Sequence, residues 1–198
     1  MTDTKATQQL EFQYNHDCDE NGILHWLATV GSRYTERGHG KQWYNPADKV
    51  QVTLSSVSGA FEFPSYVVLD RSTQEEKSFV ATKGEKPNQW IQFDFGTTLR
   101  IQPTAYTLES AEAFFCQLLR NWQFQGSNDG KVWATIRDHI ADESLTTKPE
   151  RKVARASWQV GDKMFYRYFR VIQTGPNADG NHILALRRFE LYGKVLFV

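Results

Sequence analysis

Residues 90–95, which read WIQFDF, decide the fold class because apolar and polar side chains alternate along them. On an extended chain, Ile91, Phe93 and Phe95 share one face, while the side chains between them point the other way. A repeat of two residues is typical of a β-strand that is buried on one side. The stretch therefore predicts one strand of a sheet that packs against a hydrophobic core.

The same alternation recurs along the chain and predicts further strands. Its clearest instances are residues 10–15, 120–125, 165–172 and 187–193, and weaker ones are residues 50–54, 65–70, 101–108, 132–138 and 156–160. Because Pro103 cannot donate a hydrogen bond to a neighbouring strand, we expect residues 101–108 at a sheet edge or a bulge. Asp-Gly in the stretch SNDGK (127–131) supplies the positive φ of a hairpin turn between two of these strands.

One helix at most is expected. Only residues 109–119 (ESAEAFFCQLL) show a helical pattern, and two stretches without periodicity, 31–48 and 70–88, are predicted to be long surface loops. Together these features predict an all-β antiparallel sandwich with long loops and at most one short helix. We divide the chain into a polar N-terminal tail, residues 1–9, and a single domain, residues 10–198.

The composition disfavours some classes of protein and some kinds of partner. The 198 residues contain 23 Lys or Arg and 23 Asp or Glu, and this balance disfavours nucleic acid and anionic membranes as partners. No apolar run approaches the roughly 18 residues of a membrane span, and the polar start lacks the apolar core of a secretory signal. Cys18 and Cys116 are the only cysteines, which favours two reduced thiols in a cytoplasmic protein over a disulfide between them.

Near the N-terminus, Asp17, Asp19, Asn21 and Gly22 follow the spacing D-x-D-x-N-G with which an EF-hand calcium loop begins. The twelfth position of that loop needs a carboxylate, and because it is Ala28 here, an EF-hand is rejected. In the favoured interpretation, the polar side chains cap nearby backbone amides in Asx turns and Gly22 adopts a positive φ. In the alternative, Asp17, Asp19 and Asn21 hold a structural calcium ion. We expect no other cofactor.

Four segments together resemble the discoidin domain, also called the coagulation factor 5/8 type C domain, of the galactose-binding-like superfamily. They are WIQFDFG (90–96), NWQFQGSNDGKVW (121–133), YRYFRVI (166–172) and FELYG (189–193). The opening motif of residues 17–29, WYNP at 43–46, and the pair AYTL and LRNW are similar to the intracellular discoidin-like domains of HECT-type ubiquitin ligases and BTB-domain proteins. The resemblance extends over about residues 10 to 193.

The resemblance implies a jelly-roll β-sandwich whose two sheets pack face to face and whose chain ends lie side by side. The terminal cysteine pair of the secreted discoidin domains is absent, which argues against the blood-clotting branch and its membrane-binding role. The 198 residues contain no HECT, BTB or RING segment, so a ligase activity is not carried over. Some galactose-binding-like domains carry a calcium ion near the first loop, and the resemblance therefore keeps the calcium hypothesis open.

The sequence lacks the motifs of familiar catalytic sites. There is no G-x-S-x-G elbow, and the stretch RGHGKQ (37–42) lacks the Ser or Thr that follows Lys in a phosphate-binding loop. The five histidines fall mostly in predicted loops, where a lone His is usually solvated: His16, His25, His39, His139 and His182. We therefore expect no enzymatic activity.

Recognition on a rigid β-sandwich usually falls to the loops at one end. The loop of residues 31–45 is richest in the residue types that dominate protein interfaces, and its candidate contacts are Arg33, Tyr34, Arg37, His39 and Lys41. We predict a protein-binding module or structural subunit of a larger cytoplasmic assembly, for which the cytoskeleton is one candidate. The alternative is a carbohydrate-binding module that uses aromatic and polar residues at a loop end.

Overall fold

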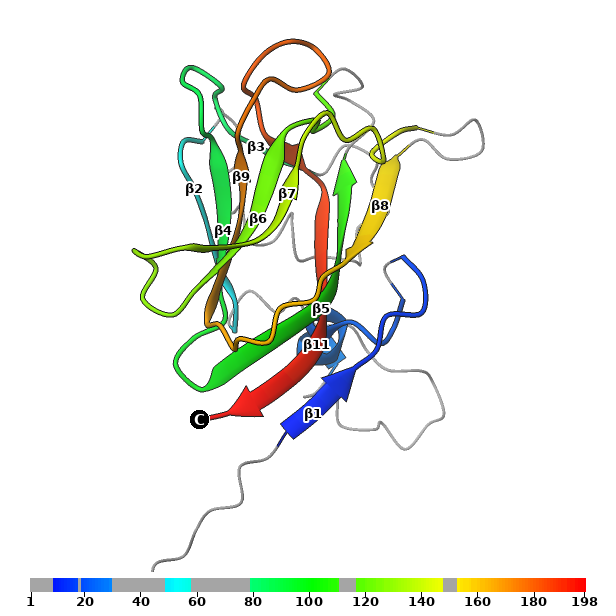
Figure 1. Cartoon of the computed structure of the whole chain (residues 1–198), viewed down its shortest axis with the longest axis vertical. Helices are drawn as coiled ribbons and strands as arrows, with labels where there is room; N and C mark the ends of the chain where they lie inside the picture. Colours follow the sequence, from blue (N-terminus) through cyan, green and yellow to red (C-terminus); the bar gives the residue numbers. More distant parts are fainter. Residues whose placement is uncertain (1–8, 18, 30–48, 58–78, 111–116, 148–152) are drawn as a thin grey trace, which may run out of the picture.

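A four-stranded and a five-stranded antiparallel sheet face each other across the core (Figure 1). The computed structural model describes residues 9–17, 19–29, 49–57, 79–110, 117–147 and 153–198, and every structural statement below concerns these residues. The alternating segments of the sequence supply the strands of both sheets. The predicted all-β antiparallel sandwich with a single short helix is confirmed.

The four-stranded sheet joins the two ends of the described chain. Its strands follow the order β1 (Gln9–Phe12), β11 (Arg188–Phe197), β5 (Leu99–Ser110) and β8 (Ala154–Gln159). Gln9 pairs with Leu196, so the two ends of the described part of the chain lie side by side, as the resemblance implied for the domain. The division into a tail and one domain stays a prediction, although Gln9 already lies in a strand.

The five-stranded sheet forms the opposite layer. Its strands follow the order β2 (Gln51–Leu54), β4 (Trp90–Asp94), β9 (Tyr168–Gln173), β6 (Trp122–Ser127) and β7 (Ala134–His139). A small third sheet pairs β3 (Val80–Ala81) with β10 (Ala185–Leu186). The strand predicted at residues 65–70 lies outside the described residues.

Two strand predictions need correction. Residues 80–81 fall in the predicted loop 70–88, yet they form β3, because both side chains are buried where this strand pairs with β10. Strand β5, predicted at an edge or a bulge, lies in the interior of its sheet, so the edge prediction is wrong. The bulge is confirmed, since the register with β11 shifts between Tyr192 and Gly193 opposite Pro103. The interrupted ladder tolerates a residue without an N–H group.

The described part of the segment predicted as a helix, residues 109–110 and 117–119, is not helical. Glu109 and Ser110 end strand β5, while residues 111–116 lie outside the described part. Pairing of β5 with β8 and β11 overrides the local helical pattern at Glu109, as tertiary context often does. The short helix is α1 (Ile23–Thr29), which directly follows the acidic loop.

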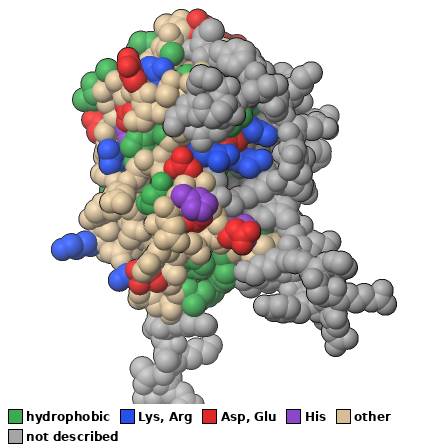
Figure 2. Space-filling view, turned by 90° about the vertical axis from the view of Figure 1, so that its right-hand side faces the viewer, with side chains coloured by type: hydrophobic (Ala, Val, Ile, Leu, Met, Phe, Trp, Pro, Cys, Tyr) green, Lys and Arg blue, Asp and Glu red, His purple; other side chains and the backbone are tan. Residues whose placement is uncertain are grey.

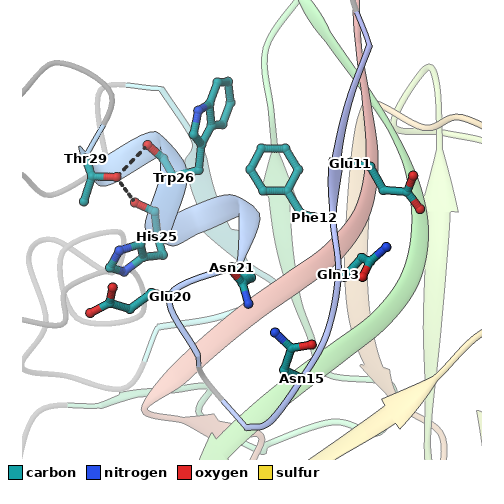
Figure 3. Close-up of a pocket in the computed structure, with 9 residues that line it drawn as sticks. All are labelled: Glu11, Phe12, Gln13, Asn15, Glu20, Asn21, His25, Trp26 and Thr29. Atoms are coloured by element: carbon teal, nitrogen blue, oxygen red, sulfur yellow. Dashed lines mark hydrogen bonds between the residues drawn. The ribbon is translucent and has the colours of Figure 1, made fainter.

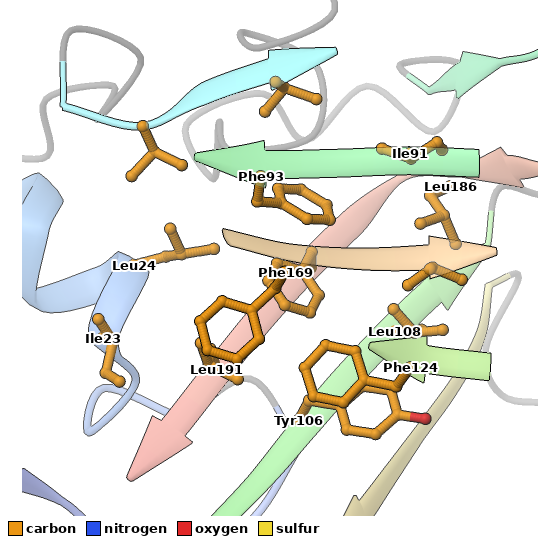
Figure 4. Close-up of a cluster of buried hydrophobic side chains, with 14 of the residues drawn as sticks. Ile23, Leu24, Ile91, Phe93, Tyr106, Leu108, Phe124, Phe169, Leu186 and Leu191 are labelled. Atoms are coloured by element: carbon orange, nitrogen blue, oxygen red, sulfur yellow. The ribbon is translucent and has the colours of Figure 1, made fainter. Parts of the chain in front are cut away.

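Aromatic rings from the two sheets stack on each other in the core (Figure 4). Phe93 of β4 stacks on Phe189 of β11 with ring centroids 4.1 Å apart, and Tyr106 of β5 stacks on Phe124 of β6 at 4.2 Å. All four side chains are at most 3% exposed. These pairs fill the space between the layers and hold the sheets in register with each other.

Helix α1 is held by a buried carboxylate from the closing strand. Glu190 of β11 is fully buried and accepts hydrogen bonds from the backbone N–H groups of Leu24 (2.8 Å) and His25 (3.3 Å). These donors would otherwise lack partners at the start of the helix, and the carboxylate also complements the helix dipole. Gly22 does not adopt the predicted positive φ. It is required because a Cβ there would collide with the Glu190 carboxylate.

Gly22→Ala is expected to destabilise the fold, because the added methyl group pushes Glu190 away from the helix start. We expect a loss of about 1–3 kcal/mol in the free energy of unfolding, measured by urea titration. Gly161→Ala is the matched control, because a Cβ at Gly161 meets no atom within 4 Å. Equal stability of the two variants would contradict the role assigned to Gly22.

Candidate functional site

The acidic loop before α1 is organised by hydrogen bonds to Asp19. This side chain is 4% exposed, and its carboxylate accepts hydrogen bonds from the backbone N–H groups of Asn15 (2.9 Å), His16 (3.2 Å) and Asn21 (2.8 Å). A short acidic side chain that bonds amides of its own loop forms an Asx-type turn. This geometry supports the favoured interpretation of the motif.

Asp17 ties the same loop to the sheet. Its carboxylate accepts hydrogen bonds from the hydroxyl groups of Tyr14 (3.0 Å) and of Ser157 in β8 (2.6 Å). In the described part of the chain, no three His, Cys, Asp or Glu side chains gather in a way that could hold a metal ion. The oxygens of Asp17 and Asp19 already serve protein donors, so the loop fits a hydrogen-bonded turn better than a calcium site. The calcium hypothesis for Asp17, Asp19 and Asn21 remains untested and leads to a prediction below.

A groove of about 450 Å³ opens between strand β1 and helix α1 (Figure 3). Phe12 of β1 and Trp26 of α1 form its apolar part, with ring centroids 5.3 Å apart. The rest of the lining is polar and comes from Glu11, Gln13, Asn15, Glu20, Asn21, His25 and Thr29. The groove therefore offers an aromatic surface beside a rim that can donate and accept hydrogen bonds.

The charge of the groove restricts what it can bind. Glu11 and Glu20 contribute carboxylates, and no Lys or Arg is among the described residues that line it. An anionic ligand would meet repulsion without a compensating cation. The groove is thus suited to neutral hydrogen-bonding groups and to cations.

Strand β1 forms one edge of the four-stranded sheet, directly beside the groove. The edge of a sheet presents backbone N–H and C=O groups to which an extended segment of another chain can pair. The groove and the edge together form one candidate contact surface.

The predicted contact residues Arg33, Tyr34, Arg37, His39 and Lys41 lie outside the described residues. Their loop begins directly after α1, whose last residue, Thr29, lines the groove. The groove could not be read from the sequence, because Phe12 and Trp26 belong to different elements. The motif ILHWLAT (23–29) contains Trp26, but it gave no indication that this ring would pack against Phe12.

A second polar cluster is buried between β5, β6 and β8. His139 is 3% exposed, so the expectation that it is a solvated loop residue is wrong. Its Nε2 lies 2.6 Å from the hydroxyl group of Tyr106, and its Nδ1 lies 2.6 Å from the Asp142 carboxylate. The ring also stacks on Trp122 at 3.9 Å, and Trp158 donates a hydrogen bond to Asp142 (3.1 Å).

The partners of His139 define its tautomer. A carboxylate only accepts hydrogen bonds, so the Nδ1–H of His139 donates to Asp142, and Nε2 of the neutral ring accepts from Tyr106. Burial lowers the pKa of His139 and outweighs the opposing effect of Asp142, while burial raises the pKa of Tyr106. This chain of Tyr, His and Asp resembles a proton relay, but its burial beneath two Trp rings marks it as part of the core.

A third cluster surrounds Glu109, which is fully buried at the end of β5. Arg155 and Arg187 donate hydrogen bonds to its carboxylate, and Arg188 lies 3.6 Å from it. These arginines compensate the charge of the buried carboxylate. Glu109 can therefore lie in a strand, although the sequence predicted a helix there. Figure 2 shows one face of the molecule, where Lys and Arg side chains gather above a region with His, Asp and Glu side chains.

Of the described residues, none belongs to a helix with the length and apolarity needed to cross a membrane. The two-layered sandwich with a polar and aromatic groove defines a class of protein, the β-sandwich binding module. The F5/8 type C domain model matches residues 51–188. The chain belongs to the F5/8 type C domain family, which confirms the resemblance seen in the sequence.

Relatives of the chain are much longer proteins. E3 ubiquitin-protein ligase Ufd4 of Drosophila melanogaster is 32% identical over 188 residues, which are 94% of this chain and 6% of that protein. BTB/POZ domain-containing protein At2g30600 of Arabidopsis thaliana is 33% identical over 178 residues, which are 85% of this chain and 20% of that protein. The chain thus corresponds to a small part of each relative.

Solved structures share the fold at low sequence identity. A CBM32 domain of Clostridium perfringens in complex with GalNAc-β-1,3-galactose superposes with a TM-score of 0.55 at 13% identity, over 75% of this chain and 98% of that one. A chitosan-binding module of a chitosanase/glucanase from Paenibacillus superposes with a TM-score of 0.54 at 19% identity, over 73% of this chain and 96% of that one. F5/8 type C and CBM32 domains are binding modules, although they occur within larger enzymes.

If the acidic loop is a hydrogen-bonded turn, removal of divalent cations leaves its stability unchanged. We expect the same Tm in thermal unfolding with added calcium and with a chelator. If a calcium ion bound Asp17, Asp19 and Asn21 in the folded state only, calcium would raise the Tm as its concentration rises above the Kd. A dose-dependent increase would therefore establish the calcium alternative.

The buried His139 makes stability dependent on pH. Because its pKa is lower in the folded state than in the unfolded chain, the stabilisation is fully present above about pH 6.5 and is lost as pH falls through the folded-state pKa. Each proton taken up contributes a slope of up to about 1.4 kcal/mol per pH unit. In His139→Gln, urea unfolding is expected to show a flatter dependence between pH 7 and pH 5 than in the wild type. Equal slopes would contradict this role of His139.

Proposed function

We propose that this chain is a protein-interaction module or structural subunit of a larger intracellular assembly, and that the groove between β1 and α1 contacts the partner. The groove itself is the observation that carries the proposal. It combines the Phe12 and Trp26 rings with a hydrogen-bonding rim, and it adjoins the edge strand of a rigid sheet. Protein interfaces characteristically combine an aromatic centre with a polar rim.

The chemistry of the groove suggests an extended segment as the partner's contact. Backbone groups of such a segment can pair with the edge of β1, while one of its side chains enters the groove. The carboxylates of Glu11 and Glu20 favour a neutral or basic side chain in that position. The loop residues Arg33, Tyr34, Arg37, His39 and Lys41 belong to the same proposal as further contacts, because their loop follows α1.

The relatives support a role within an assembly. Both are many times longer than the region they share with this chain, so the domain operates there beside other segments. A module that contacts other proteins is compatible with a position beside other segments of a long chain. The proposal includes a cytoplasmic location. The cytoskeleton is one candidate for the assembly.

The test is affinity purification with mass spectrometry from the native source, with two matched variants. Gln13 is exposed and is among the residues that line the groove, and Gln13→Arg introduces a long, positively charged side chain there. Gln159→Arg makes the same change at an exposed position on β8, the opposite edge of the sheet. We expect stoichiometric partners with the wild type and Gln159→Arg, and their loss with Gln13→Arg. Retention of the same partners by Gln13→Arg would contradict the assignment of the groove.

Carbohydrate binding is the second candidate. The groove lining combines the amide side chains of Gln13, Asn15 and Asn21 with the ring of Trp26, which suits sugar hydroxyl groups and ring faces. A glycan array distinguishes the two candidates, because saturable binding of a neutral glycan that Gln13→Arg abolishes would favour the carbohydrate function. Binding to protein partners alone would favour the interaction module.

A further inference from the structure

The outer face of the five-stranded sheet carries an arginine in an unusual position. Arg170 of β9 lies directly opposite Gln92 of β4 on one side and Gln125 of β6 on the other. It thus stands near the middle of a sheet surface, flanked by two amide side chains. This face lies on the opposite layer from β1 and its groove (Figure 1).

Two contacts hold the guanidinium group of Arg170 in place. Its Nε donates a hydrogen bond to the amide oxygen of Gln125 (2.6 Å), and its Cζ lies 4.2 Å from the ring centroid of Trp133. Gln125 is itself 8% exposed and donates a hydrogen bond to Gln123 (2.7 Å). The position of the cation is therefore defined before any ligand arrives, which lowers the entropic cost of binding.

Arg167, three residues before Arg170, differs from it in having a carboxylate partner. Its Nε and one terminal nitrogen donate to the two carboxylate oxygens of Asp94, at 2.7 Å and 2.8 Å. This paired geometry raises the pKa of Arg167, whereas burial lowers that of Arg170. Among the described residues, Arg170 has no ion pair, and no hydrogen bond engages its terminal nitrogens.

Carboxylates on the same face do not neutralise Arg170. Asp94 is engaged by Arg167, and Asp138 lies on β7 opposite Gln123, in a different row of the sheet. A half-buried guanidinium group without a carboxylate has lost part of its hydration without an electrostatic compensation. Its two terminal nitrogens match the geometry of a carboxylate from outside the chain.

We propose that this face of the sheet, centred on Arg170, binds an acidic segment of a partner protein through an Asp or Glu carboxylate. The carboxylate accepts two hydrogen bonds from the terminal nitrogens of Arg170. Because the chain has zero net charge, the attraction is local to this face rather than general. This surface is separate from the groove, and its role does not depend on that of the groove.

The surroundings of Arg170 favour a protein over another acidic ligand. Partly exposed apolar side chains lie in the adjacent rows, namely Trp90, Trp133, Tyr168 and Ile172. Together with Arg, aromatic residues of this kind contribute most of the binding energy in protein interfaces. A half-buried arginine surrounded by aromatic rings therefore resembles the centre of such an interface.

The experiment is a titration followed by NMR of the side-chain N–H groups of Arg and Trp. The probe is a short acetylated peptide of alternating Asp and Tyr residues, and the control peptide has Asn in place of Asp. We expect the acidic peptide to shift the Nε–H signal of Arg170 and the indole signal of Trp133, with an affinity that falls as salt is added. The control peptide should leave both signals unchanged.

Matched variants test the geometry. Arg170→Gln and Arg170→Lys are both expected to weaken binding of the acidic peptide about tenfold or more, because each loses the paired hydrogen bonds. Arg100→Gln removes the same charge from β5 on the other sheet and should bind like the wild type. Thermal unfolding confirms that each variant is folded.

Several results would overturn the proposal. Unchanged Arg170 and Trp133 signals would exclude this face, and equal affinity of Arg170→Gln and Arg100→Gln would exclude the arginine. Wild-type affinity of Arg170→Lys would exclude the paired geometry. If an oligomer of uronic acid shifts the Arg170 signal while the peptide does not, the site recognises acidic sugars instead of a protein.

Discussion

The stacking of aromatic rings across the two sheets is the contact on which the rest of the molecule depends. Phe93 on Phe189 and Tyr106 on Phe124 each join one layer to the other in the fully buried centre. Each pair joins a strand of one sheet to a strand of the other, β4 to β11 and β5 to β6, so the arrangement of the strands and the packing of the rings determine each other. This packing makes the two sheets rigid, and both candidate surfaces, the groove and the face around Arg170, are built on these sheets.

The buried Glu190 extends that rigidity to the chain's only described helix. It joins the closing strand to the start of α1, and Gly22 leaves room for its carboxylate. Asp19, from the motif whose spacing suggested calcium ligands, accepts backbone hydrogen bonds in the turn that directly precedes this helix. Because α1 forms one wall of the groove, the position of the groove follows from this capping interaction.

The two candidate surfaces have opposite electrostatic character. The described lining of the groove contains carboxylates and amides but no Lys or Arg, whereas the face of the five-stranded sheet presents Arg170 between two glutamines. On a chain with zero net charge, such a separation allows one domain to contact two chemically different segments. Under the two proposals, the domain would join two parts of an assembly through these surfaces.

The sequence by itself determined the strands of the two large sheets, because a two-residue repeat has only one face that can be buried, but it did not predict the short strands β3 and β10. Ile91, Phe93 and Phe95 are at most 1% exposed, as their alternation predicted. Only the tertiary structure decided the place of the helix, the burial of His139 and the partners of Arg170. Each depends on a residue distant in sequence: Glu190 caps the helix, Tyr106 bonds His139, and Gln125 orients Arg170. Local patterns report which side of a segment is buried, but contacts between segments exist only after the sheets have packed.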